Sequence, residues 1–225
     1  MSERDSEDMN DFTPELLLRA YCAGIFPMGE TRGDPTLYWV DPEKRAIIEL
    51  DRFHLPRRLA RTVRNGPFEV TCDQDFEGVM RACAAPRRYQ NESWINQPIV
   101  ELYTGLYKRG FAHSVECRVD GVLVGGLYGV SINGAFFGES MFSRARDASK
   151  VALVHLVARL IKGGFSLLDC QFMTEHLRQF GTTEIVRAEY RLRLERAIAQ
   201  RAHFYLELGG AEACGIVTQA RTHTS

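Results

Sequence analysis

Two dipeptides, Asp120-Gly121 and Asn133-Gly134, constrain the fold of this chain more than any other feature of its sequence. Each stands between two apolar runs. Asn or Asp followed by Gly is the strongest short-range signal for a tight hairpin turn, because both central residues of that turn adopt positive φ. The runs span residues 113–120, 122–132 and 135–142. The spacing therefore predicts three consecutive antiparallel strands, a β-meander.

Strand and helix patterns lie on both sides of this meander. Before it, the periodicity predicts strands over residues 46–50 and 68–72 and helices over residues 55–66, 73–84 and 97–110. After it come an apolar helix, a buried strand and an amphipathic helix, over residues 148–164, 165–171 and 187–204. These patterns indicate an α+β domain with a mixed central sheet. The order of elements is also similar to that of the GNAT-like acyltransferase fold.

The first 45 residues have a different character. Thr13-Pro14-Glu15 supplies the residue types that begin a helix, which we expect to end at Gly24. The next twenty residues are crowded with Gly, Pro and aromatic side chains, which predicts a loop-rich segment packed on the rest. A chain of 225 residues that is 45% hydrophobic can bury one large core and carry a small appendage. We therefore predict a small N-terminal domain, residues 1–45, and a GNAT-like domain, residues 46–225.

Charge and cysteine content exclude several classes of protein. A net charge of −1 argues against binding nucleic acid through bulk charge, although a local basic patch is compatible with it. The six cysteines form no C-x-x-C pair, so we expect no metal site and no disulfide framework. The acidic N-terminus does not resemble a secretion signal, and no apolar run approaches the roughly 20 residues of a membrane span. The sequence thus predicts a cytoplasmic chain with no membrane segment.

Three polar residues interrupt strand patterns that are otherwise apolar: Glu139, Asp169 and Gln171. Alternation along a strand puts Asp169 and Gln171 on one face, and Glu139 shares their cleft if this strand neighbours the meander. A buried carboxylate needs a donor or a cationic partner to stay ionised. Two interpretations stay open. The three residues form a catalytic cleft, or Glu139 pairs with Arg144 or Lys150 while Asp169 caps the helix that follows.

Two further features suit nucleic acid. A tryptophan in a loop, such as Trp94, can stack on a nucleobase, or it can pack the N-terminal segment against the main domain. Four arginines lie in one short helix, in which Arg57, Arg61 and Arg64 share a face and Arg58 lies beside them. Such a row suits phosphates, and it is equally typical of a solvated charged face.

Familiar catalytic motifs are missing. The sequence contains no G-x-S-x-G, P-loop or H-E-x-x-H, which argues against the common hydrolases. Acetyltransferases that use coenzyme A place a glycine-bearing pyrophosphate loop between the last meander strand and the next helix. This chain reads SRARDASKVAL there, without a glycine. We therefore expect an acyl donor other than a coenzyme A thioester.

Eight motifs, taken in order, resemble the bacterial leucyl/phenylalanyl-tRNA–protein transferases. They are GIFPM, YW-x-DP-x-x-R-A, SWI, AHS-x-E, GG-x-YGV, GESMFSR, ASK and DCQ, between about residues 16 and 198. The resemblance implies transfer of leucine or phenylalanine, with methionine a further candidate, from leucyl-tRNA or phenylalanyl-tRNA. The acceptor is the α-amino group of a protein that begins with Arg or Lys, and the product is an N-degron for proteolysis. No cofactor is implied.

The same resemblance implies catalytic residues. Asp169 and Gln171 occupy the catalytic positions of the DCQ motif, and Glu139 falls at the active-site acid. Trp94 matches the tryptophan that stacks on the terminal adenosine of the tRNA. The same adenosine contact is implied for Met28, which follows GIFP where many members carry an aromatic residue, and a methionine stacks less well. A glutamine amide is too weak a base to remove a proton outright, so we expect Gln171 to orient the attacking amine and Asp169 to fix or polarise the amide.

Two larger groups of residues complete the implied site. The apolar pocket for the transferred side chain consists of Leu127, Phe136, Leu153 and Leu168. The acceptor-stem backbone contacts Arg57, Arg58, Arg61 and Arg64. Two rival functions remain: a coenzyme A-dependent N-acyltransferase, favoured by the order of elements, and a non-catalytic RNA-binding module, favoured by the arginines and loop aromatics.

Overall fold

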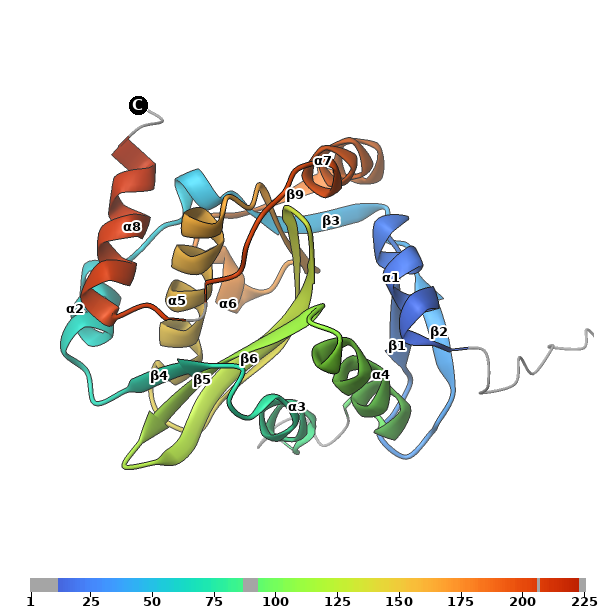
Figure 1. Ribbon diagram of the computed structural model, residues 1–225, viewed down its shortest axis with the longest axis horizontal. Helices are drawn as coiled ribbons and strands as arrows, with labels where there is room; N and C mark the ends of the chain where they lie inside the picture. Colours follow the sequence, from blue (N-terminus) through green and yellow to red (C-terminus); the bar gives the residue numbers. More distant parts are fainter. Residues whose placement is uncertain (1–11, 87–92, 206, 223–225) are drawn as a thin grey trace, which may run out of the picture.

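A seven-stranded mixed sheet forms the centre of the protein (Figure 1). The computed structural model describes residues 12–86, 93–205 and 207–222. The strands lie in the order β4-β5-β6-β7-β8-β3-β9, and β7 and β8 are parallel whereas the other neighbours are antiparallel. Their bounds are β3 Lys44–Ile48, β4 Glu69–Cys72, β5 Ala112–Val119, β6 Val122–Ile132, β7 Ala135–Ser143, β8 Leu167–Gln171 and β9 Thr182–Val186. The predicted meander is confirmed as β5-β6-β7, and the class is α+β with a mostly antiparallel mixed sheet.

Helices cover both faces of this sheet (Figure 1). Their bounds are α1 Pro14–Cys22, α2 Arg57–Asn65, α3 Phe76–Ala84, α4 Gln97–Lys108, α5 Ala148–Gly163, α6 Glu175–Arg178, α7 Arg187–Ala199 and α8 Gly210–Thr222. Side chains of α2, α5, α6 and α8 build one buried apolar cluster, and side chains of α1, α3, α4 and α7 build the other. The sheet therefore lies between two helical layers, each with its own core.

Local sequence signals explain where the predicted elements begin and turn. The side chains of Thr13, Asp75 and Asn96 accept hydrogen bonds from backbone N–H groups at the starts of α1, α3 and α4. At the hairpin turns, Asp120 and Asn133 both adopt φ of 50°. These caps and turns act locally, which is why the sequence alone predicts them.

Several elements were not predicted. Residues 25–44, expected to be loop-rich, contain a separate two-stranded sheet of β1 Phe26–Gly29 and β2 Leu37–Val40. The short helices α6 and η2 (Leu50–Arg52), the edge strand β9 and the C-terminal helix α8 were also missed. In β9 two of five side chains are buried, so its sequence lacks a clear alternation. Helix α8 lies beyond the region in which any motif was recognised.

Two β-bulges lie where strands β7 and β8 stop pairing. These strands pair from Ala135–Leu167 to Phe137–Asp169, and no further. In β7 the register with β6 passes from Gly138 to Ser140, which leaves Glu139 as an extra residue. In β8 the register with β3 passes from Asp169 to Gln171, which leaves Cys170 as an extra residue. Bulges bend a strand and redirect its side chains, so a fork opens between β7 and β8 at this point.

Candidate active site

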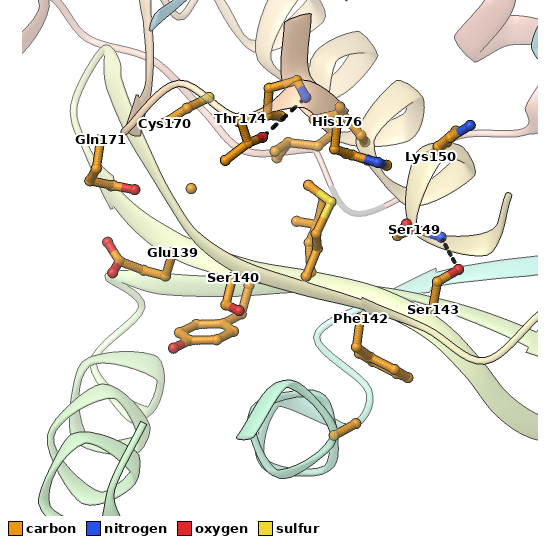
Figure 2. A pocket seen from close by; sticks show the side chains of 18 of the residues that line it. Glu139, Ser140, Phe142, Ser143, Ser149, Lys150, Cys170, Gln171, Thr174 and His176 are labelled. Carbon is orange, nitrogen blue, oxygen red and sulfur yellow. Dashed lines mark hydrogen bonds between the residues drawn. The ribbon is translucent and has the colours of Figure 1, made fainter. Parts of the chain in front are cut away.

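A cavity of about 890 Å³ lies at this fork (Figure 2). Glu139 and Gln171 line one end, where their side chains face each other. Ser149 and Lys150, at the start of α5, line the other end. The wall between the two ends is apolar and consists of Leu127, Met141, Leu153, Leu156, Leu168 and Leu177. The cavity therefore offers a polar end, an apolar wall and a basic end in succession.

The carboxylate of Glu139 lies deep in the protein, and its half-buried side chain is exposed to the cavity. It accepts hydrogen bonds from the hydroxyl groups of Tyr21 (2.6 Å) and Tyr103 (3.1 Å), which also contact each other. Burial raises the pKa of Glu139 from its ordinary 4.5 to about 7, against the lowering effect of the two tyrosine donors. Glu139 can thus change its charge near neutral pH.

The predicted structural alternative for Glu139 is wrong. The guanidinium of Arg144 lies over the ring of Phe142, 5.4 Å from its centroid. Lys150 pairs instead with Asp147, at 3.2 Å. Tyrosines from α1 and α4 are the partners of Glu139, and no sequence spacing relates them to β7.

Asp169 is fully buried and holds a buried arginine. Both carboxylate oxygens accept hydrogen bonds from Arg45, from Nε at 3.0 Å and from Nη2 at 2.8 Å, and the hydroxyl of Tyr190 donates at 2.8 Å. Arg45 is 1% exposed, and its guanidinium also lies between the rings of Phe26 and Tyr190. Asp169 does not cap the following helix, because the side chain of Thr174 caps α6. The second half of the structural alternative is therefore wrong as well.

Gln171 lines the cavity, whereas Asp169 does not. Strict strand alternation predicts both residues on one face. The extra residue Cys170 and the left-handed conformation of Gln171, with φ of 57°, break this alternation. Asp169 still holds Gln171, because its Oδ1 accepts the backbone N–H of Gln171 at 2.9 Å.

The amide of Gln171 is oriented by two carbonyl groups. With Nε2 turned toward β7, it donates to the carbonyl oxygens of Gly138 (2.8 Å) and Cys170 (3.2 Å). The opposite orientation would bring its oxygen against these acceptors. With Nε2 used in this way, Oε1 is the acceptor that the Gln171 side chain has left to offer.

Three of the four residues expected to form an aminoacyl pocket line the cavity: Leu127, Leu153 and Leu168. Phe136 does not. Its buried ring packs against Phe165 and Phe204, in the part of β7 that still pairs with β8. Met141, Leu156, Phe172 and Leu177 are among the apolar lining residues that were not predicted. Leu156 could have been found, since it follows Leu153 by one helical turn.

Trp94 and Met28 lie outside the cavity lining. Both are partly buried against the apolar cluster of α1, α3 and α4. They lie in neighbouring segments, because a Cβ added to Gly29 would come within 2.6 Å of the carbonyl oxygen of Trp94.

The four arginines of α2 are all exposed. Leu59 and Val63 bury the opposite side of this helix against the core. Arg57 and Arg64 line a groove between α2 and α8, whereas Arg58 lines a separate hollow and Arg61 lines neither. Of the three arginines predicted to share a helical face, Arg57 and Arg64 line the same groove.

No three His, Cys, Asp or Glu side chains in residues 12–86, 93–205 and 207–222 are grouped so that they could hold a metal ion. In the same residues, no helix combines the length and apolar character needed to cross a membrane.

Comparisons with known proteins agree in pointing to one family. Residues 47–195 match the family model of the leucyl/phenylalanyl-tRNA protein transferases, and residues 10–43 match the model of their N-terminal domain. The leucyl/phenylalanyl-tRNA–protein transferase of Phenylobacterium zucineum (strain HLK1) is 61% identical over 203 residues, which cover 90% of this chain and 91% of the relative. That of Caulobacter vibrioides (strain NA1000 / CB15N) is 59% identical over 200 residues, covering 89% and 92%.

Solved structures give a weaker likeness. The structure of L-PGS from Bacillus licheniformis aligns with 73% of this chain and 55% of its own, at 14% identity and a TM-score of 0.38. That score carries no argument about fold or function. The sequence comparisons decide the question, since two family models together match most of the chain and close relatives cover nearly all of it. The chain belongs to the leucyl/phenylalanyl-tRNA–protein transferase family.

Proposed function

We propose that this chain transfers leucine or phenylalanine from aminoacyl-tRNA to the α-amino group of proteins that begin with Arg or Lys. The product carries a new peptide bond and a new N-terminal residue, which serves as an N-degron. One observation carries the proposal beyond family membership. A single cavity brings a carboxylate, an amide and an apolar wall together, and these suit a cationic acceptor, an attacking amine and an apolar aminoacyl group.

The chemistry requires positioning more than activation. An aminoacyl ester is already reactive, so the amine needs to be held near the carbonyl carbon while the developing oxyanion is stabilised. The C–N bond forms, the ester C–O bond breaks, the amine loses a proton and the ribose oxygen gains one. The reaction is thus balanced without a redox partner, a nucleotide or a metal ion.

Gln171 and Asp169 have different roles in this proposal. Oε1 of Gln171 accepts a hydrogen bond from the attacking amine and orients its lone pair. Asp169 is a positioning residue, because it holds the backbone of Gln171 and does not line the cavity. The two carbonyl groups that accept from Nε2 hold the amide plane in place. A hydrogen-bonded amide of this kind is pre-organised for the transition state.

Glu139 pairs with the cation of the acceptor protein. Its carboxylate lies at the same end of the cavity as Gln171, where the α-amino group must arrive. A guanidinium or ammonium group at this place forms a charge-assisted hydrogen bond and offsets the cost of burying the carboxylate. This accounts for an acidic residue inside an apolar strand.

The apolar wall receives the side chain of leucine or phenylalanine, or of methionine, through Leu127, Leu153 and Leu168. Such a surface favours unbranched and γ-branched apolar side chains through buried area. Phe136 supports the wall from behind. Trp94, with Met28 near it, stacks on the terminal adenosine, and the arginines of α2 contact the acceptor-stem backbone.

The wider architecture and location also form part of the proposal. The divergence of β7 and β8 supports a GNAT-like fold, since that fold splays its central strands at the acyl-transfer site. We place the division between an N-terminal unit and the main domain beside residues 45/46, at the start of β3, because the whole of that strand pairs within the central sheet. Charged tRNA and newly made proteins are cytoplasmic, and we place the reaction there.

Narrowing the apolar wall tests the pocket. Leu153→Phe, on α5, should lower transfer from phenylalanyl-tRNA at least about tenfold and transfer from leucyl-tRNA less, because one added ring removes space that the larger side chain needs. Leu160→Phe is the matched control, since Leu160 is buried on the same helix and does not line the cavity. Both changes overpack a core, at about 1–3 kcal/mol. If transfer from phenylalanyl-tRNA and from leucyl-tRNA fell equally in both variants, that result would argue against the pocket.

The decisive test of the function measures transfer directly. Purified protein is mixed with radiolabelled leucyl-tRNA and a model protein that begins with Arg, and the label in hot-acid precipitate is counted. We expect transfer by the wild type, none to the same protein beginning with Ser, and a collapse of transfer in Gln171→Ala, Glu139→Ala and Asp169→Ala. Retained tRNA binding without transfer by the wild type would favour the RNA-binding module. A clear rise of the melting temperature with acetyl-coenzyme A would favour the coenzyme A enzyme.

A further inference from the structure

Three hollows follow one another from the catalytic cavity to the C-terminal helix. Asp147 lines both the cavity and a second hollow of about 470 Å³, which is bounded by α2 and the loop before α5. Helix α2 lines that hollow and, on its other side, the groove between α2 and α8, which has a volume of about 500 Å³. Helices α2 and α8 pack side by side against α5 (Figure 1). The three hollows therefore neighbour one another in this order, the first two at Asp147 and the last two across α2.

Each of the three hollows carries its own cations. The basic end of the cavity has Arg144 and Lys150, the second hollow has Arg58 and Arg146, and the groove has Arg57, Arg64 and Arg221. We call these seven residues the basic track. Beyond the Glu139 end of the cavity, Asp147 is the one carboxylate among the described lining residues of the three hollows. It lies within 3.2 Å of Lys150 and 3.8 Å of Arg146.

An uneven balance of this kind favours a polyanion. The seven cations repel one another, and Asp147 offsets only part of that repulsion, so anions bound in the hollows would stabilise this surface. A small anion would need one pocket, whereas cations in three successive hollows match repeated phosphates along a strand. The exposed arginine side chains present planar forks that bind phosphate oxygens in pairs. The chain as a whole has a net charge of −1, so this surface is a local patch.

We propose that the phosphodiester backbone of the aminoacyl-tRNA leaves the cavity along the basic track and that Arg221 of α8 binds its far end. This inference rests on the proposed function, which places the 3′ end in the cavity. Residue 221 lies beyond residue 195, where the match to the family model ends. Family membership therefore does not imply a contact from α8. The C-terminal helix, so far without a role, becomes part of the RNA-binding surface.

Single changes on the track test the proposal in the full-length protein. Arg221→Gln and Arg146→Gln remove one guanidinium each, and Arg196→Gln removes an exposed arginine from α7, away from all three hollows. The affinity for deacylated tRNA is measured over a series of KCl concentrations. Each track variant should weaken binding about three- to eightfold at low salt and make the slope of log Kd against log[KCl] shallower by about 0.9. Arg196→Gln should change neither.

A donor without phosphates separates this proposal from the proposed function. 3′-O-leucyladenosine carries the ester and the adenosine but no backbone. Arg221→Gln should raise KM for leucyl-tRNA without changing kcat. The rate of transfer from 3′-O-leucyladenosine should be the same as that of the wild type. The proposal would be overturned if the wild type transfers leucine from leucyl-tRNA but Arg221→Gln binds tRNA as tightly as Arg196→Gln does. Equal losses with both donors would also overturn it, since they would indicate a structural role for α8. No transfer by the wild type from either donor would overturn the proposed function itself.

Discussion

Replacing Asp169 by asparagine is expected to lower the free energy of unfolding by about 3–5 kcal/mol. The rate of leucine transfer should fall about 100-fold or more. The change removes the charge that compensates Arg45, which is 1% exposed and therefore shielded from bulk solvent. It also replaces a carboxylate, whose Oδ1 accepts the backbone N–H of Gln171, by an amide that has one acceptor oxygen where the carboxylate has two. Urea unfolding measures the first effect, and transfer from leucyl-tRNA measures the second.

A matched control separates burial from charge pairing. The pair of Arg193 on α7 with Glu49, the residue before η2, has an N–O distance of 2.6 Å, but its side chains are 33% and 28% exposed. Glu49→Gln should therefore cost no more than about 1 kcal/mol. Should Asp169→Asn unfold at the assay temperature, Tyr190→Phe removes a single donor to the same carboxylate and should cost about 1.5–3 kcal/mol. An Asp169→Asn protein with wild-type stability and wild-type transfer would contradict our account of this residue.

Local signals in the sequence predicted the elements of the site but not its arrangement. The Asx-Gly pairs gave the meander, since a two-residue turn depends on its own φ values. The polar residues in apolar strands drew attention to Glu139, Asp169 and Gln171. Their mutual orientation was wrong, because strand alternation assumes regular pairing. The extra residues Glu139 and Cys170 depend on the register of β6 and β3, which no local pattern records.

The partners of the two carboxylates show the same limit. Arg45 and Asp169 are 124 residues apart in the chain, and Tyr21 and Glu139 are 118 residues apart. The residues near Glu139 in the chain predicted a cation as its partner, whereas the fold supplies tyrosines from α1 and α4. A buried carboxylate predicts that donors exist, and only the packing of helices on the sheet determines which ones.

The raised pKa of Glu139 gives a stability effect with a defined sign. In the unfolded chain this group loses its proton near its ordinary value of 4.5, whereas in the folded protein it keeps the proton up to about pH 7. Between these values the folded state binds more protons, so the free energy of unfolding falls as pH rises, by roughly 3 kcal/mol in total. Glu139→Gln removes this contribution. The difference in stability between wild type and variant should therefore decline from pH 5 to pH 7.5, as measured by urea unfolding.

The same titration should control recognition of the acceptor, with the opposite sign. The carboxylate binds a cation only when ionised, so kcat/KM for an acceptor beginning with Arg rises as pH passes about 7, the pKa of free Glu139. The acceptor amine also loses its proton in this range, but the ratio of wild type to Glu139→Gln cancels that effect. We expect a ratio of only a few at pH 6 and of about 10–100 at pH 8.

A second variant tests whether the titration of Glu139 causes this pH dependence. Tyr21→Phe removes a donor that stabilises the ionised form of Glu139, so the pKa of Glu139 should rise further and the midpoint of the profile should move to higher pH. A model acceptor with a neutral first residue serves as the reference, since it gains nothing from the carboxylate. A ratio that stays constant from pH 6 to pH 8 would mean that Glu139 does not pair with the acceptor cation. Its burial beside two tyrosines would then serve only to shape the fork between β7 and β8.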